Sequence, residues 1–133
     1  MRYVFVELPG ERTPLIRPAI PVQVEDLAEA PQLCLVDTGA TTNRFAGWLA
    51  EAVGIDLSGA PEQELVVGGV RARAKLARAD LTIAGTRYDA PVSFCDPWPF
   101  AFSLLGQEGF LRFFRVTVCA ADGWLDVTPE AEL

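Results

Sequence analysis

The sequence predicts a single domain, residues 1–133, that is built mostly of β-strands. Its 10 prolines and 11 glycines are spread along the chain, and they separate short runs of β-branched and aromatic residues, a pattern typical of strands joined by turns. Half of the residues are hydrophobic and 22% are charged. This composition allows a folded core and excludes a disordered chain, and the length leaves no room for a second domain.

Nine strands are expected in order along the chain. The first is favoured over a secretory signal, because the N-terminal residues alternate in polarity and lack a long apolar stretch. Acidic and turn residues predict a surface loop at residues 25–31. The dipeptide Asp122-Gly123 is typical of a tight hairpin turn and separates the last two strands. The expected strands cover residues 2–7, 20–24, 32–36, 64–67, 70–77, 80–84, 88–94, 115–120 and 124–127.

One amphipathic helix is predicted among these strands. Five apolar residues recur at the i, i+3, i+4, i+7 and i+8 spacing that places them on one helix face. Asn43 or Thr42 can cap the start of this helix, and Gly54 stands where a helix commonly ends. A shorter helix is expected at residues 107–114. The five apolar residues are Phe45, Trp48, Leu49, Ala52 and Val53.

The residue types present narrow the possible chemistry. The chain contains no histidine, which excludes Ser-His-Asp and Cys-His nucleophiles and histidine-ligated zinc. Cys34, Cys95 and Cys119 lack a Cys-x-x-Cys spacing, so we expect three reduced residues in apolar surroundings and a cytoplasmic location. A net charge of −7 disfavours nucleic acid as a partner, and no apolar run has the length of a membrane span. Carboxylates remain as catalytic groups, and neither a metal nor a cofactor is expected.

A carboxylate at the end of a hydrophobic strand is the strongest candidate for chemistry. Four apolar residues, 33–36, lead directly into Asp37-Thr38-Gly39-Ala40, and the predicted helix begins a few residues later. On its own, this pattern is also that of a strand end followed by a turn and a helix cap. The other Asp-Gly pair, at Asp122, lacks both the hydroxyl residue and the apolar strand.

Three motifs in this order resemble those of the retropepsin-like aspartic proteases, bacterial members in particular. The first is Asp37-Thr38-Gly39 after its strand. The second is a hydrophobic stretch, residues 65–70, that contains Gly68-Gly69. The third is Leu104-Leu105-Gly106 before the second predicted helix. The resemblance implies a small closed β-barrel of the acid-protease type, with one clear helix after the Asp-Thr-Gly loop and a short late helix.

The resemblance also implies a homodimeric aspartic endopeptidase. In this family two carboxylates share one proton, so that one activates water and the other protonates the peptide carbonyl. Asp37 would be the catalytic carboxylate, Thr38 would hold the pair rigid, and Gly39 would allow close approach of the substrate backbone. Because the chain carries one Asp-Thr-Gly, the second carboxylate would come from a second copy, in a twofold homodimer with the site on its axis.

Substrate contacts are implied around the same motifs. Gly68-Gly69 is a tight hairpin turn in any interpretation, and the resemblance implies that it closes over a bound peptide as a flap. Trp98, Phe100 and Phe102 are either core or dimer contacts or a wall of the substrate pocket. Gln107 stands where viral members have an arginine, so their ion pair with acidic residues after Asp-Thr-Gly-Ala cannot form. The implied substrate-binding residues are Ala40, Val67, Gly68, Gly69 and Leu104.

Two other functions fit the sequence less well. A dimer of the same fold could bind peptides or partner proteins as an adaptor without cleaving them, although such a protein has no need of an intact Asp-Thr-Gly. An unrelated small β-barrel that serves as a binding module would require all three motifs to occur by chance.

Overall fold

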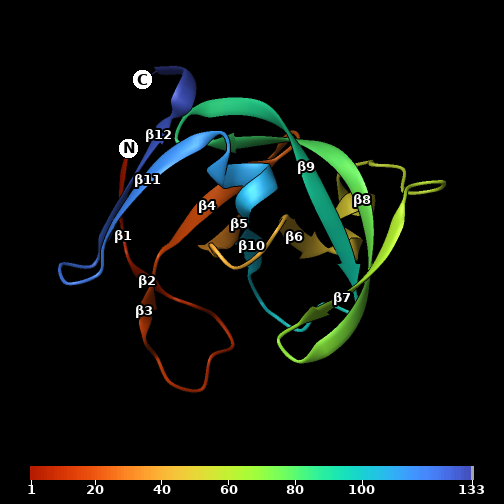
Figure 1. Ribbon diagram of the computed structural model, residues 1–133, viewed down its shortest axis with the longest axis horizontal. Coiled ribbons are helices and arrows are strands. Elements are labelled where there is room, and N and C mark those ends of the chain that lie inside the picture. Colours follow the sequence, from red (N-terminus) through yellow and green to blue (C-terminus); the bar gives the residue numbers. More distant parts are fainter. Residues whose placement is uncertain (133) are drawn as a thin grey trace.

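The computed structural model describes residues 1–132, and strands dominate it, as the sequence predicts (Figure 1). Seven strands form the main sheet in the order β4-β5-β10-β6-β9-β8-β7. Strand β4 also pairs with β8, so six of the seven strands close into a barrel, and β7 extends from it as the outer arm of a hairpin. The seven strands are β4 (Ala19–Val24), β5 (Leu27–Val36), β6 (Asn43–Ala46), β7 (Glu62–Val67), β8 (Val70–Ile83), β9 (Thr86–Asp96) and β10 (Ser103–Leu105).

A second sheet joins the two ends of the chain. Strand β12 (Trp124–Pro129) lies between β1 (Arg2–Val4) and β11 (Phe114–Cys119), so the two termini lie on the same side of the barrel (Figure 1). A short ribbon of β2 (Val6–Glu7) and β3 (Ile16–Arg17) follows, where the sequence predicts one continuous strand over residues 2–7. The chain leaves β1 at Phe5, whose backbone N–H bonds to Gly123 instead of to a strand partner.

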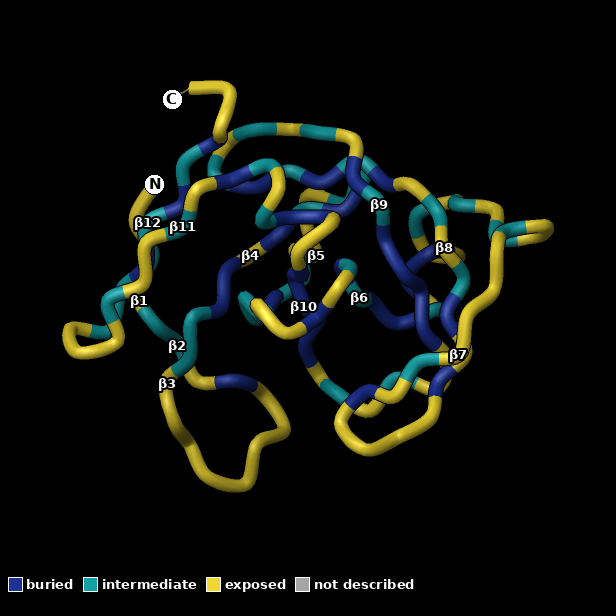
Figure 2. Tube along the Cα trace, in the orientation of Figure 1, coloured by how far each residue is buried: buried dark blue, intermediate teal, exposed yellow. Residues whose placement is uncertain are grey.

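Alternating residues of the barrel strands fill its interior, which Figure 2 shows in dark blue. The main buried cluster contains the aromatic rings of Phe45, Phe94 and Phe110. A smaller cluster, which includes Val67 and Leu104, lies under the β7–β8 hairpin. This second cluster is the floor on which the candidate site is built.

The first predicted helix is present but shorter than the sequence suggests. Helix α1 covers Gly47–Ala52, whereas residues 43–46 form β6, which runs parallel to β9 and antiparallel to β10. Asn43 is therefore not the helix cap, because its buried amide bonds to backbone groups of two neighbouring segments instead. Trp48 belongs to the predicted apolar face, yet its surface is 64% exposed.

The late helix is also confirmed, with different bounds. It is a single π-helical turn, η1 (Gln107–Leu111), and Phe114, at the predicted helix end, already begins β11. A short 3-10 turn, η2 (Glu130–Glu132), ends the described chain. None of the helices within residues 1–132 has the length and hydrophobicity that crossing a membrane requires.

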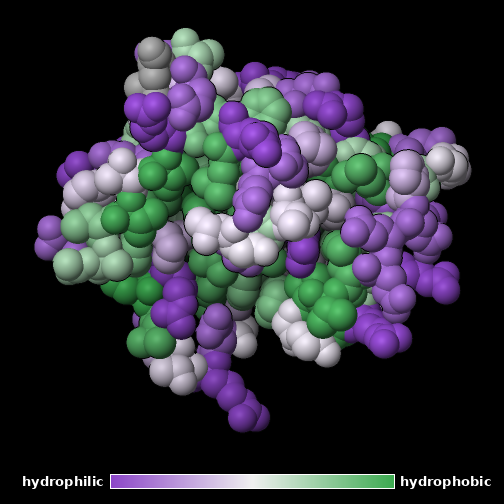
Figure 3. Space-filling view, in the orientation of Figure 1, coloured by the Kyte–Doolittle hydropathy of each residue, from purple (hydrophilic) through white to green (hydrophobic). Residues whose placement is uncertain are grey.

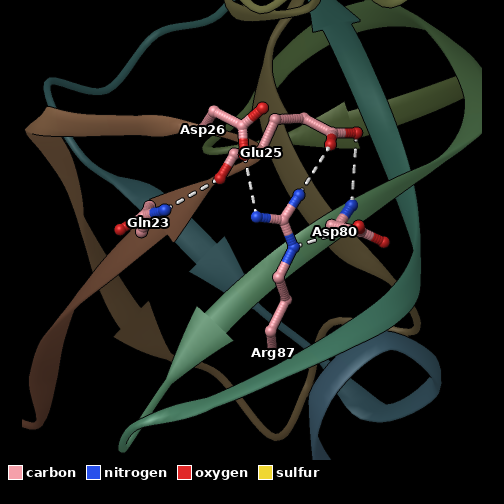
Figure 4. Close-up of polar contacts among 5 residues, drawn as sticks. All are labelled: Gln23, Glu25, Asp26, Asp80 and Arg87. Carbon is pink, nitrogen blue, oxygen red and sulfur yellow. Dashed lines mark hydrogen bonds and ion pairs between the residues drawn. The ribbon is translucent and has the colours of Figure 1, made fainter.

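The prediction of a surface loop at residues 25–31 is wrong. After a tight turn at Glu25 and Asp26, residues 27–31 are already part of β5. Arg87 stabilises this turn from β9: its guanidinium lies 2.8 Å from an Asp26 carboxylate oxygen, 3.1 Å from Asp80 and 3.6 Å from Glu25 (Figure 4). The hydrogen bonds to Asp26 and Asp80 raise the pKa of Arg87. Acidic residues here mark an exposed hairpin with a basic partner, not a loop.

Strand β8 is one strand of 14 residues, where the sequence predicts two separate strands, at residues 70–77 and 80–84. Nearly its whole length pairs with β9, and the expected break at Arg78 and Ala79 faces Pro91 and Ala90 in that ladder.

Candidate active site

Asp37 follows directly on the end of β5. Strand β5 runs parallel to β10, with Val36 opposite Leu105, and the Asp37 N–H continues this ladder by donating to the Leu105 carbonyl oxygen at 2.9 Å. The Asp37 carboxylate accepts a hydrogen bond from the Gly39 N–H at 3.0 Å, the geometry of an Asx turn. The carboxylate is thus held by its own turn, half-buried at the edge of the barrel.

The third motif packs directly against the first. The Gln107 N–H donates to the Ala40 carbonyl oxygen and the Glu108 N–H to that of Thr41, each at 2.9 Å. The Gln107 side-chain amide donates to the Thr38 carbonyl oxygen at 2.7 Å. Gln107 therefore holds the Asp-Thr-Gly loop by a hydrogen bond between neutral groups. Viral members have an arginine at this position, and the ion pair that it forms cannot form here.

Asn43 has a structural role and is not the helix cap that the sequence predicts. Its side chain is fully buried, and its Oδ1 accepts a hydrogen bond from the Gly106 N–H at 3.0 Å, while Nδ2 donates to the Pro91 carbonyl oxygen at 3.4 Å. A buried polar group that is satisfied in this way holds its neighbours in one arrangement. Asn43 thus ties β6 to β9 and to the start of η1, which carries Gln107.

The β7–β8 hairpin turns at Gly68 and Gly69, as predicted. Both glycines have positive φ, at +57° and +78°, the combination required by a two-residue type I′ hairpin turn. Gly68 lies against the ring of Phe100, and a Cβ there would stand 2.6 Å from the Phe100 Cζ atom. Phe100 in turn stacks on Phe102, with ring centroids 4.9 Å apart. The hairpin tip therefore rests on an aromatic segment that lies close to Asp37.

A cavity of about 360 Å³ joins these parts. Among the residues predicted for the site, Asp37, Val67, Gly68 and Leu104 line it. Thr38, Gly39 and Gly69 do not line it, and Ala40 is buried. The cavity is lined in addition by Glu11, Leu35, Arg44, Val66, Phe100 and Phe102.

Two charged residues of this lining were not predicted. Glu11 lies in the exposed β2–β3 loop, and Arg44 lies on β6 next to Leu104. Arg44 directly follows Asn43, the residue expected to cap the helix, but it lies in β6, where it is partly exposed between the buried Asn43 and Phe45. Figure 3 shows that hydrophobic side chains are exposed near the β2–β3 loop and near the β7–β8 hairpin.

A larger cavity, about 660 Å³, lies elsewhere and is not lined by Asp37. Helix α1, the β8–β9 ladder and the segment at residues 98–100 surround it. Phe100 lines both cavities, whereas Trp98 lines only the larger of the two. Of the three aromatic residues singled out in the sequence, Phe100 and Phe102 line the cavity at Asp37 and Trp98 does not.

Two of the three cysteines are buried, as expected, and the third is not. Cys34 and Cys95 are at most 1% exposed, and Cys119 is partly exposed. Burial raises the pKa of Cys34 strongly and that of Cys95 to about 11. We expect iodoacetamide at pH 8 to add one label to the native protein, at Cys119, and three to the unfolded protein, as read by intact and peptide mass spectrometry. More than one label before unfolding would contradict the buried positions.

Comparison with known proteins identifies the fold. The sequence matches no family model and no curated protein. The structure is similar to that of a retropepsin-like aspartic protease from Rickettsia conorii, with a TM-score of 0.59 and 19% identity over 96% of this chain and 89% of that one. It is also similar to the EIAV protease complexed with the inhibitor HBY-793, with a TM-score of 0.50 and 20% identity over 68% of this chain and 82% of that one. The chain therefore has the fold of the retropepsin-like aspartic proteases, which confirms the resemblance that its three motifs indicate.

Proposed function

We propose that this protein is a homodimeric aspartic endopeptidase in which Asp37 is the catalytic carboxylate. The observation that carries the proposal is the cavity that Asp37 shares with Val67 and Gly68 of the hairpin and with Leu104 of β10. A carboxylate in a groove of mixed apolar and charged lining, beneath a hairpin, is suited to an extended peptide whose carbonyl group lies over the acid. The fold supports the same chemistry.

Two Asp37 carboxylates, one from each subunit, supply the acid and the base. Two like charges about 4 Å apart repel by about 4 kcal/mol at an effective dielectric constant of about 20, so the pair retains one proton. The ionised carboxylate takes a proton from water as the water oxygen bonds to the peptide carbon, and the protonated one gives its proton to the carbonyl oxygen. The C–N bond then breaks as the nitrogen takes a proton, which leaves one carboxyl and one amine product.

The neighbouring residues have positioning roles in this proposal. Thr38 is exposed beside Asp37, where it can reach the partner subunit and fix the pair of carboxylates. Gly39 donates its N–H to the Asp37 carboxylate and keeps the space above it free of a side chain. Ala40 fixes the loop through its backbone bond to Gln107.

The hairpin is proposed to act as a flap over the bound peptide. Val67 and Gly68 face the cavity. A Cβ atom added to Gly69, at the tip, would have no neighbouring atom within 4 Å, so this turn has room to move. Closure of the hairpin would exclude water from the reacting carbonyl group, and Leu104 would provide the apolar surface below the peptide.

A cytoplasmic location and the absence of nucleic acid or membrane partners remain predictions. Cys34 and Cys95, which are buried and form no disulfide, support a reducing compartment.

The test of the proposal is cleavage of a random peptide library, with products identified by mass spectrometry. We expect internal cleavage, and we expect specific activity to fall on dilution as the dimer measured by sedimentation dissociates, because each subunit supplies one carboxylate. Full activity of a strict monomer would overturn the dimeric site. If no peptide is cleaved at any pH while the dimer is intact, the protease assignment is wrong.

A further inference from the structure

Arg44 is the one cationic side chain that lines the Asp37 cavity within the described residues. It lies in the middle of β6, opposite Leu104 of β10 and beside Ser93 of β9. Its Nε atom is buried and has no hydrogen-bond partner. Among residues 1–132, its guanidinium forms no ion pair, although seven other arginines do.

The surroundings of Arg44 make this unpaired charge costly. The apolar side chains of Leu35, Val67 and Leu104 line the same cavity, and Val67 and Leu104 belong to the buried cluster beneath the hairpin. Burial of Nε removes part of the hydration of the guanidinium, and an anionic partner can compensate for that loss. Two carboxylates line the cavity, those of Asp37 and Glu11, and neither lies within the 4.0 Å of an ion pair with Arg44.

We infer that Arg44 selects peptides that carry an aspartate or glutamate side chain close to the scissile bond. The inference rests on the proposed function, because it places the peptide over Asp37. A carboxylate side chain from a peptide fits the planar guanidinium through two parallel N–H···O bonds. Because the Nε atom of Arg44 is buried and without a partner, such a pair is less screened by water than one on the open surface.

The neutral amide analogue of the substrate is the sharpest comparison. Gln has nearly the shape of Glu but no charge, so it leaves the guanidinium without an anionic partner. A charge-assisted hydrogen bond contributes enough to favour the acidic peptide by about tenfold to 100-fold. The preference is expected at one position on each side of the scissile bond, since each subunit of the proposed twofold dimer contributes one Arg44 at a fixed place on its β6.

The test separates binding from cleavage. Peptide pools with acetylated and amidated ends, random except for one position fixed as Glu or Gln, are offered to the Asp37→Asn protein, and retained peptides are quantified by mass spectrometry. We expect enrichment of the Glu pool by about tenfold or more when the fixed residue lies at either of the two positions related by the twofold axis, and not at the others. The same fixed positions should raise kcat/KM in the protein that retains Asp37.

Variants assign the preference to Arg44. Arg44→Met removes the charge while keeping a long side chain, and it should abolish the difference between the Glu and Gln pools. Arg44→Gln should have the same effect and is used if Arg44→Met fails to fold. Arg78→Met is the matched control, because Arg78 pairs with Asp89 on an exposed part of the β8–β9 ladder, and it should keep the full preference.

Each other outcome is informative. Equal retention of the two pools, or a preference that persists in both Arg44 variants, overturns the inference. Enrichment of pools with a free C-terminus regardless of the fixed residue also overturns it, because the carboxylate would then be that of the chain end. Failure of the unsubstituted protein to cleave any pool, with an Arg44-dependent preference in binding, overturns the protease assignment and leaves carboxylate recognition in place.

Discussion

Replacing Asp37 by Asn is expected to abolish peptide cleavage and to leave the fold intact. In a homodimer the substitution removes both carboxylates, so neither a base for water nor an acid for the carbonyl oxygen remains. Loss of one such proton transfer alone lowers a rate by roughly 10²- to 10⁴-fold. Asn keeps a carbonyl oxygen that can accept the Gly39 N–H, which now bonds to the Asp37 carboxylate at 3.0 Å, so the turn should persist.

The measurement is cleavage of the best library peptide, followed by mass spectrometry, with peptide binding followed by fluorescence anisotropy. Asp122→Asn is the matched control, because Asp122 occupies the other Asp-Gly pair, in an exposed turn, and its loss should change neither quantity. The proposal predicts that Asp37→Asn binds peptide and does not cleave it. Identical products from Asp37→Asn and the unsubstituted protein would show that these carboxylates are not the catalyst.

Mixing the Asp37→Asn protein with the unsubstituted protein tests whether the active site is shared between two subunits. When equal amounts of the unsubstituted and Asp37→Asn proteins exchange subunits freely, about a quarter of the dimers carry two Asp37 residues. Activity should then fall to about half of its value before mixing, since dimers with one Asp37 are inactive. Activity that is unchanged by the added Asp37→Asn subunit would place the active group within one chain. The adaptor alternative predicts no cleavage by any of these proteins and equal binding by all of them.

The features predicted best are those that a short stretch of sequence specifies locally. The Asp-Thr-Gly turn, the Gly68-Gly69 hairpin and the start of the late helix at Gln107 depend on turn chemistry within a few residues. Each was placed correctly, and their order along the chain indicated a fold that no sequence comparison identified. Local patterns also gave most strands of the barrel.

The features missed depend on partners far away in the sequence. Residues 43–46 share the apolar spacing of the helix that follows them, and their strand conformation is favoured by pairing with β9 and β10, about 50 to 60 residues later. Asn43 was interpreted as a helix cap for that reason, and the strand position of Arg44 was not predicted. The acidic turn at Glu25 and Asp26 was likewise taken for a loop because its basic partner, Arg87, lies on another strand.

Replacing Gly106 by Ala is expected to cause a large loss of stability. Gly106 has an extended backbone, with φ −116°, so its requirement for glycine is one of space. A Cβ atom would overlap the carbonyl oxygen of Thr42 and would lie 2.7 Å from that of Ala40. These are backbone atoms, which cannot rotate away as a side chain can.

The collision would separate the two motifs of the site. Moving Gly106 away from the loop weakens its own bond to Asn43 and the bond from the Gln107 N–H to the Ala40 carbonyl oxygen. Overpacking costs about 1–3 kcal/mol and each weakened buried hydrogen bond about 1 kcal/mol more. We therefore expect the free energy of unfolding to fall by about 3 kcal/mol or more, measured by urea denaturation.

Gly59→Ala is the matched control for this substitution. Gly59 has φ +75° and open space where a Cβ atom would stand, so alanine there costs only backbone strain, about 1 kcal/mol. A loss for Gly106→Ala no larger than that of Gly59→Ala would mean that the Asp-Thr-Gly loop and η1 are not packed as described. A larger loss, together with reduced cleavage at temperatures where the variant is still folded, is the expected result, because the Asp37 N–H bonds to Leu105, the residue immediately before the displaced glycine.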